Sequence, residues 1–261
     1  MPVYGMPSLL ELSDPASCAG LCRALAFQFV ELNMDLPQYL PGEADLPALR
    51  RAAAEYDIFY TLHLPEGLDV CALDPNVAAG HRRTAAQALD LALELEAPVL
   101  NLHLPRGIHF TLPEGKVFLC ERYRDRCLAA LEDFRRLCEE KLAGTGARIC
   151  IENTTGFLPF QREWLELLLA SPVFGLTLDV GHDCRAEGED RPVYAAHRDR
   201  LCHIHLHDVR EGKDHLPLGT GEVDLPAALA LAEEQNCRVV VETKTAASLR
   251  RSARWLKENC P

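Results

Sequence analysis

Apolar residues along the chain gather in eight short segments, and the pattern between these segments is typical of helices. The segments are rich in β-branched and aromatic residues, which favours strands, and they cover residues 2–6, 27–34, 58–64, 98–104, 148–153, 174–180, 201–208 and 238–244. Apolar residues at three- and four-residue spacing predict helices over residues 47–55, 77–96, 116–142, 161–169, 225–235 and 246–258. Residues 184–200 are charged and predict a long loop with a short helix.

Strand and helix alternate along the whole chain. Repeated alternation of this kind indicates a parallel sheet, and eight strand–helix units close into a barrel. The 261 residues contain no linker or low-complexity tract, and barrels of this type use about 250 residues. We therefore predict an α/β fold consisting of one domain over residues 1–261, a single (β/α)8 TIM barrel.

The composition places the chain among ordinary globular proteins, with 48% hydrophobic and 25% charged residues. No apolar run reaches the ~18 residues of a membrane helix, and the first residues lack the basic start and apolar core of a signal peptide. The eleven cysteines are scattered, which favours buried thiols in a reducing compartment. We expect a cytoplasmic protein that does not enter a membrane.

The charge of the chain bears on its partners. With 27 basic and 39 acidic residues the net charge is −12, and no cluster of basic residues stands out. Because such a surface repels phosphate backbones, we do not expect nucleic acid as a partner.

Polar residues occupy the same end of nearly every predicted strand. Seven of the eight segments finish in a carboxylate or an imidazole, namely Glu31, His63, His103, Glu152, Asp179, His205 and Glu242. The C-terminal ends of the strands converge at one mouth of such a barrel, where active sites lie. We therefore expect these side chains, together with His182 three residues after Asp179, to form one cluster.

The strand over residues 201–208 alternates apolar residues with three histidines. His203, His205 and His207 share one face, and each imidazole needs a polar partner if it is buried. We interpret His203 as a buried group behind the ligands. The pattern leaves His207 either at the rim of the site or exposed.

Glu152, Asp179, His205 and Glu242 are candidate ligands for one divalent metal. Three carboxylates close together repel one another unless a cation neutralises them. Oxygen ligands with a single nitrogen suit manganese, magnesium or cobalt, with zinc as an alternative. A metal here could hold the oxygens of a sugar and lower the cost of forming an enediolate. Glu152 and Glu242, on strands across the mouth, are candidates for removing and returning the proton.

The segments VELNM, NLHLP, ICIENT, LDVGHD, HIHLHD, PLGTGEVD and VVVETK resemble the xylose isomerase-like TIM barrel superfamily. The resemblance covers nearly the whole chain, and the superfamily includes sugar isomerases and epimerases, hydroxypyruvate isomerase, inosose dehydratase and zinc-dependent endonucleases that cut at abasic DNA sites. The epimerase branch implies one metal, commonly manganese, bound by Glu152, Asp179, His205 and Glu242. It also implies that His182 contacts substrate oxygens.

The endonuclease branch is similar in further positions. It implies a second zinc at His63 and His103, and a third zinc at His182 together with an Asp-x-His pair. Here Lys213 stands where that aspartate belongs, although His215 is present. This departure and the acidic composition disfavour DNA cleavage.

These observations predict a metal-dependent isomerase or epimerase acting on a sugar or sugar phosphate, by proton abstraction next to a carbonyl through a metal-bound enediolate. The residues expected to contact the substrate or to bind further metal are His63, His103, His182, His215, Glu31 and Lys213. Three alternatives stay open: a zinc-dependent phosphodiesterase at abasic sites, a lyase of the keto-inositol dehydratase type, and a non-catalytic sugar-binding barrel. The expected partner is a small carbohydrate, and a homo-oligomer is compatible with the sequence.

Overall fold

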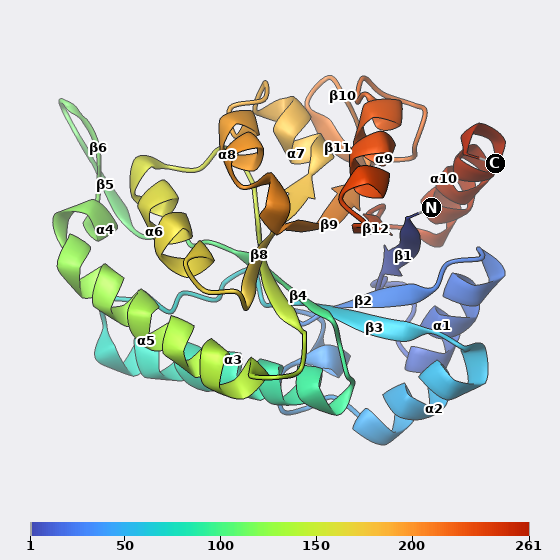
Figure 1. Ribbon diagram of the computed structural model, residues 1–261, viewed down its shortest axis with the longest axis horizontal. Coiled ribbons are helices and arrows are strands. Elements are labelled where there is room, and N and C mark those ends of the chain that lie inside the picture. The colour runs from blue at the N-terminus through green and yellow to red at the C-terminus, as the bar shows by residue number, and fades with distance from the viewer. Residues whose placement is uncertain (1, 261) are drawn as a thin grey trace.

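A closed barrel of eight parallel strands forms the centre of the protein, as seen in a computed structural model that describes residues 2–260 (Figure 1). The strands follow the order β1-β12-β9-β8-β7-β4-β3-β2 around the barrel. Their bounds are β1 (Val3–Pro7), β2 (Phe29–Asn33), β3 (Phe59–His63), β4 (Val99–His103), β7 (Arg148–Glu152), β8 (Phe174–Asp179), β9 (Leu201–Leu206) and β12 (Arg238–Val241). Seven predicted segments each contain one of these strands, β1 extends one residue beyond the predicted segment 2–6, and the predicted fold class is confirmed.

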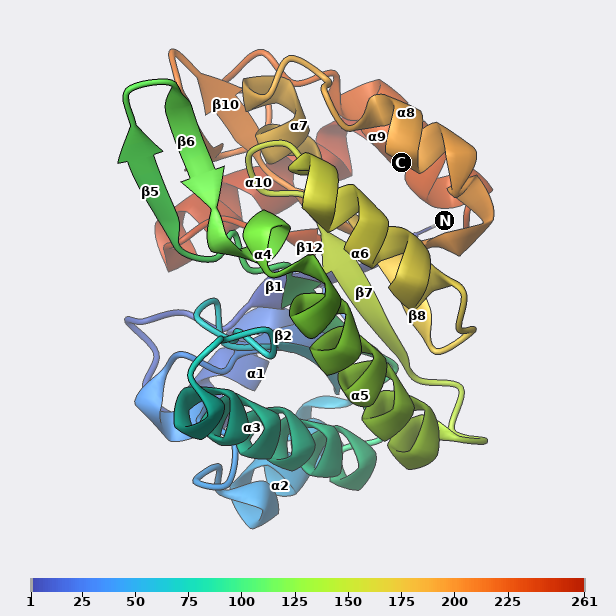
Figure 2. The same ribbon diagram turned by 90° about the vertical axis from the view of Figure 1, so that its left-hand side faces the viewer.

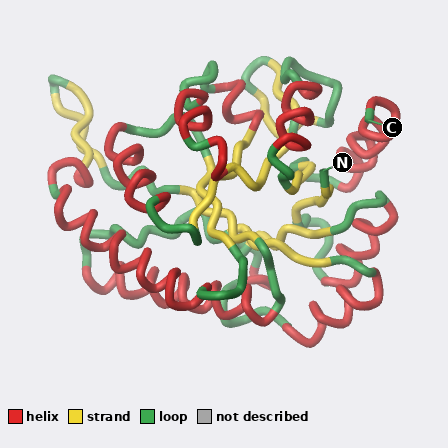
Figure 3. The backbone as a smooth tube through the Cα atoms, in the orientation of Figure 1, coloured by secondary structure: helices red, strands yellow, loops and turns green. Residues whose placement is uncertain are grey.

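Helices surround the strands, as the colouring by secondary structure shows (Figure 3). The longer helices are α1 (Pro15–Ala24), α2 (Leu46–Tyr56), α3 (Pro75–Glu94), α5 (Arg124–Leu142), α6 (Pro159–Leu169), α9 (Leu225–Glu234) and α10 (Ala246–Asn259). Shorter ones are α4 (Leu119–Arg122), α7 (Val180–Arg185) and α8 (Arg191–Ala196), with 3-10 turns η1 (Pro37–Tyr39) and η2 (Arg198–Arg200). The helix α1 lies outside the predicted ranges. In the part of the chain described, no helix is long and apolar enough to cross a membrane.

Local sequence signals set where several helices begin. Helices α1, α2, α3 and α9 each follow an aspartate whose carboxylate accepts a backbone N–H of the first turn, and each has proline at its first or second position; these aspartates are Asp14, Asp45, Asp74 and Asp224. The carboxylate satisfies a donor that the helix leaves unpaired, and proline fits where no N–H is needed.

The predicted helix over residues 116–142 is wrong at its beginning. Residues 109–118 form an antiparallel hairpin of β5 (His109–Leu112) and β6 (Gly115–Phe118), which projects from the body of the protein (Figure 2). The helical region begins only at Leu119, with α4 and then α5. Gly115, which follows the turn, has φ of 136°, a conformation that favours glycine, and the two strands contain the β-prone residues Phe110, Thr111, Val117 and Phe118. These local preferences override the helical spacing.

A second hairpin follows β9. It pairs β10 (Asp208–Arg210) with β11 (Lys213–Leu216), and its turn residues Glu211 and Gly212 have φ of 51° and 74°. Positive φ at both central residues is the geometry of a tight hairpin turn. This hairpin carries His215 back toward the mouth of the barrel, where its backbone N–H donates to His207.

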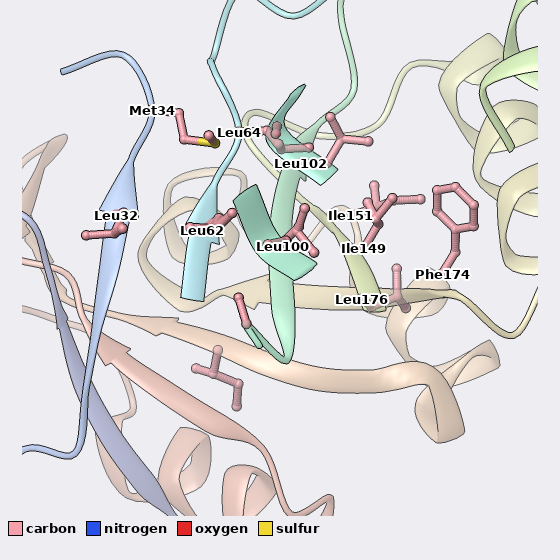
Figure 4. Close-up of a cluster of buried hydrophobic side chains, with 14 of the residues drawn as sticks. Leu32, Met34, Leu62, Leu64, Leu100, Leu102, Ile149, Ile151, Phe174 and Leu176 are labelled. Carbon is pink, nitrogen blue, oxygen red and sulfur yellow. The ribbon is translucent and has the colours of Figure 1, made fainter. Parts of the chain in front are cut away.

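The hydrophobic core lies between the barrel and the helices. Figure 4 shows part of it, with leucine and isoleucine side chains from adjacent strands gathered on one side of the sheet. The residues between them in sequence are polar in several strands, as Leu32, Leu62 and Ile151 are next to Glu31, His63 and Glu152. Because side chains alternate along a strand, packing the apolar set against the helices turns the polar set into the barrel.

Candidate metal centre

The strand ends bring four predicted ligands together at the C-terminal mouth. Glu152 ends β7, Asp179 ends β8, His205 lies on β9 and Glu242 directly follows β12. All four are buried, and one potential ligand atom from each lies within 4.8 Å of the others. Residues separated by up to ninety positions in sequence therefore form one compact group, which we call the central group.

The geometry of the central group fits a divalent cation. His205 Nδ1 lies 3.1 Å from Glu242 Oε2, 3.3 Å from Glu152 Oε1 and 4.0 Å from Asp179 Oδ2. Within residues 2–260, His205 Nδ1 and Glu242 Oε2 are buried atoms that lack a hydrogen-bond partner. Buried polar atoms rarely stay unpaired, and a cation bound between them would satisfy both. Three carboxylates and one imidazole are suitable ligands for a divalent metal.

Both glutamates of the central group are ionised. Burial would raise the pKa of Glu152, but the nearby imidazoles of His205 and His103 outweigh it and hold the pKa well below its ordinary value. Burial acts on Glu242 in the same direction, and His205 and Lys244 again lower its pKa well below the ordinary value. Each carboxylate can therefore bind a cation or accept a proton.

Glu31 contacts the ring nitrogen of His205 that does not face Glu152 and Glu242. Its Oε1 is 2.8 Å from His205 Nε2, and its Oε2 is 2.9 Å from His203 Nε2 and accepts a 2.9 Å hydrogen bond from Thr61 Oγ1. With Nε2 directed at Glu31, His205 presents Nδ1 to Glu152 and Glu242. His203 is fully buried behind this pair, and Glu31, His203 and His205 also form a group of potential ligand atoms.

A second group adjoins Glu152. His103 Nε2 lies 3.0 Å and His63 Nε2 3.6 Å from Glu152 Oε2, and these three residues form another set of potential ligand atoms. His63 Nδ1 donates a 2.8 Å hydrogen bond to the carbonyl oxygen of Leu64, so Nε2 is the nitrogen directed at the site. The side chain of Asn101 donates to the same Glu152 oxygen.

A third group contains His182, His207 and His215. His207, whose position the sequence leaves undecided, is buried, and its Nε2 is 3.0 Å from Asp179 Oδ1. His182 Nδ1 lies 3.4 Å from Asp179 Oδ2, so Asp179 contacts both imidazoles. Lys213 is exposed on β11, and the adjacent Asp214 forms an ion pair with Arg185. His207, and not Lys213, therefore completes the third group with His182 and His215.

Two residues at the site were missed by the sequence prediction. Asn153 accepts the backbone N–H of Asp179 at 2.8 Å and donates to its carbonyl at 3.0 Å, which joins the ends of β7 and β8. Lys244 Nζ lies 2.7 Å from Glu242 Oε1. Lys244 follows Glu242 by two residues, so the period-two spacing of strands could have identified it. The sequence offers no comparable signal for Asn153.

A cavity of about 270 Å³ opens beside the central group. Glu31, His63 and Glu242 line it from the site, and Lys244 lines it as well. Leu9, Leu10 and Leu36 contribute an apolar wall. The cavity thus presents carboxylates, an imidazole and an ammonium group to a small polar molecule.

The chain belongs to the xylose isomerase-like TIM barrel family, which it matches over residues 19–259. No curated protein sequence matches it. Among solved structures, a D-tagatose 3-epimerase-like protein is 22% identical with a TM-score of 0.77, over 98% of this chain and 96% of that one. The 3-keto-D-glucoside 4-epimerase of E. coli is 16% identical with a TM-score of 0.78, over 99% and 100% of the two chains.

A third similar structure is the IOLI protein with a bound zinc atom, which is 16% identical with a TM-score of 0.70 over 97% of this chain and 96% of that one. At these identities the likeness shows the fold. The family and the buried groups of histidine, aspartate and glutamate together define a xylose isomerase-like barrel whose mouth is consistent with a divalent-metal site.

Proposed function

We propose that this protein is a divalent-metal-dependent isomerase or epimerase that moves a proton at a sugar carbon next to a carbonyl. The observation that carries the proposal is the central group, in which two ionised glutamates from β7 and the end of β12 meet around His205 and Asp179. The names of two similar structures, a D-tagatose 3-epimerase-like protein and a 3-keto-D-glucoside 4-epimerase, support a sugar as substrate.

Glu152, Asp179, His205 and Glu242 would hold the metal, for which manganese is the expected ion and magnesium, cobalt or zinc are alternatives. When bound, the cation supplies a positive charge that polarises a carbonyl and favours loss of the neighbouring proton. Glu152 and Glu242 are the candidate bases, and having one on each side of the substrate lets the proton leave one face and return to another.

Other side chains would support this proton transfer. The ammonium of Lys244, in contact with Glu242 Oε1, would keep that carboxylate ionised and in place to accept a proton from the substrate. The half-buried His182 and the cavity-lining His63 present imidazole nitrogens that can orient hydroxyl groups. The burial of Glu152 excludes water from its carboxylate.

The experiment is deuterium exchange in D2O with a panel of ketoses and their phosphates. Protein stripped of metal and reloaded with Mn²⁺ should place deuterium on the carbon next to the carbonyl of one substrate. Glu152→Gln and Glu242→Gln should each lower the rate at least 100-fold. Glu55→Gln, at an exposed position on α2, is the matched control and should exchange like the unchanged protein. A dehydrated product would instead indicate a lyase that uses the same proton abstraction.

The two groups that flank the central group favour a second candidate, a multinuclear zinc phosphodiesterase. Glu152 is shared with His63 and His103, and Asp179 contacts His182 and His207, so neighbouring metals could be bridged. The net charge of −12 disfavours DNA as the substrate. Elemental analysis discriminates the two: about one metal per chain supports the isomerase, whereas two or three zinc ions with cleavage of abasic DNA would replace it.

A further inference from the structure

Two thiols lie in contact on β7 and β9, on the N-terminal side of Glu152 and His205 in these strands. Cys150 on β7 and Cys202 at the start of β9 have their sulfur atoms 3.0 Å apart, although β8 runs between these strands. We propose that Cys150 and Cys202 are a redox-active pair that closes to a reversible disulfide when the protein meets a hydroperoxide.

A glycine on the intervening strand allows the contact. Gly175 on β8 pairs with Cys150 in the sheet and has no side chain to occupy the space between the sulfurs. A Cβ atom at Gly175 would lie 3.0 Å from Cys202 Sγ and 3.5 Å from Cys150 Sγ. A larger residue at this position would therefore crowd Cys202 Sγ and, at 2.9 Å, the backbone oxygen of Arg200.

An irregularity in β9 aims the second thiol at the first. Leu176 pairs with Leu201 and Thr177 with His203, so Cys202 is an extra residue that has no partner on β8. Such a bulge changes the direction of the side chain at the extra residue. Without it, Cys202 would alternate with His203 and point to the other side of the sheet.

The two thiols differ in solvent exposure, and this difference determines which one the oxidant reaches first. Cys202 is partly exposed, whereas Cys150 is fully buried. An oxidant from solvent therefore meets Cys202 first, and Cys150 is already in place to react with the oxidised sulfur. Closing the disulfide shortens the distance between the sulfurs from 3.0 Å to about 2.05 Å, the length of an S–S bond.

The chemistry balances with a hydroperoxide as the oxidant. The Cys202 thiolate attacks the terminal peroxide oxygen, the O–O bond breaks, and an alcohol leaves after taking up a proton, which gives a sulfenic acid. The Cys150 sulfur then attacks the Cys202 sulfur, the S–O bond breaks, and water leaves as the disulfide forms. Two thiols lose two protons and two electrons, and one hydroperoxide becomes one alcohol and one water.

The disulfide would tie together the strands that carry Glu152 and His205. Cys150 precedes Glu152 by two residues on the same face of β7, and Cys202 precedes His205 by three residues on β9. Oxidation of the two thiols thus acts on the backbone that positions the central group, although formation of the bond does not depend on the proposed enzymatic activity.

Peptide mapping after treatment with hydrogen peroxide tests the proposal. Trypsin places each relevant cysteine in its own peptide, with Cys150 in 149–162, Cys202 in 201–210 and Cys237 in 214–238. Reduced protein is treated with peroxide, quenched with N-ethylmaleimide, digested and analysed by mass spectrometry. The expected product links peptide 149–162 to peptide 201–210 and disappears on treatment with dithiothreitol.

Three variants test whether the disulfide forms between Cys150 and Cys202 and does not involve Cys237. Cys150→Ser should leave Cys202 as a sulfenic acid that dimedone labels, and Cys202→Ser should leave Cys150 reduced at the same peroxide dose. Cys237→Ser, which removes the buried thiol just before β12, should form the linked peptide as the unchanged protein does. A link between peptides 201–210 and 214–238, or over-oxidation of Cys202 with Cys150 still reduced, would overturn the proposal.

Discussion

Replacing Glu31 with glutamine tests whether this carboxylate orients His205 for metal binding. Glu31 contacts His205 through Oε1 and both His203 and Thr61 through Oε2. Glutamine keeps the shape but has only one acceptor oxygen, so one imidazole loses its acceptor. Because Glu31 and both imidazoles are buried, we take the loss of one imidazole–carboxylate contact to cost about 1.5–3 kcal/mol, the range for a hydrogen bond to a charged group.

This cost appears as weaker metal binding when it falls on His205. Each 1.4 kcal/mol corresponds to about tenfold in Kd, so the estimate gives roughly a 10–100-fold higher Kd for Mn²⁺, in the range typical for groups that support metal ligands. Isothermal titration calorimetry on metal-stripped protein measures the change, with Zn²⁺ as a second probe. Circular dichroism checks that the variant is folded.

Thr61→Val is the matched control, since it removes the hydroxyl donor to Glu31 and keeps the carboxylate. We expect its Kd to stay within about threefold of the unchanged protein, because both carboxylate oxygens of Glu31 remain to contact His203 and His205. A folded Glu31→Gln protein with an unchanged Kd would refute the reasoning. Loss of a whole metal equivalent per chain would instead make Glu31 a ligand.

Three further predictions concern protons, the mouth of the barrel and the unit of folding. In metal-free protein, burial would lower the pKa of His182, but contact with Glu152 outweighs it and raises the pKa to about 9, and the pKa of His205 is also raised well above its ordinary value. Metal binding at pH 7 should therefore release protons, seen as a dependence of the calorimetric heat on buffer ionisation, and affinity should rise toward pH 9. Because these pKa values are raised in the folded state, protonation of the histidines stabilises the metal-free fold at neutral pH, and this stabilisation is lost as pH rises through about 9. The Tm of the metal-free protein should therefore fall between pH 7 and pH 9. A constant Tm and buffer-independent heats would contradict the protonation states. The buried carboxylate of Asp208 accepts hydrogen bonds from the backbone N–H groups of Val209, Thr220 and Gly221 at 2.8–3.0 Å. Asp208→Ala should therefore lower the free energy of unfolding, measured in urea, by about 3–5 kcal/mol, and Asp208→Asn should lower it by less. Equal losses in the two variants would argue against a stabilising role for these hydrogen bonds. We also propose that residues 1–261 form one domain, because β1 pairs with β12, and expect thermal unfolding by calorimetry in a single transition.

The sequence by itself determined the barrel and which residues end at its mouth. Apolar residues alternate with polar ones in the strand segments, and this period assigns each residue to the helix side or the barrel interior before any neighbour is known. Eight strand–helix units then require closure, which places the ends of all strands at one mouth. Glu152, Asp179, His205 and Glu242 could be grouped on these grounds alone.

Tertiary structure decided which side chains meet and which parts of the chain cover them. The hairpin of residues 109–118 replaces the beginning of a predicted helix, because a glycine turn and paired β-prone residues outweigh helical spacing. His207 lies on the face that the alternation predicts, but its burial depends on the β10–β11 hairpin that returns His215 to its side.

The same limit applies to contacts across strands. Periodicity gives the face of a residue, but the partner across the barrel depends on strand register and stagger, which arise only on closure. Asn153 bridges β7 and β8, and the Cys150–Cys202 contact depends on a bulge in β9 next to Gly175. Cysteines fifty-two positions apart carry no sequence signal of their contact, because one unpaired residue in β9 creates it.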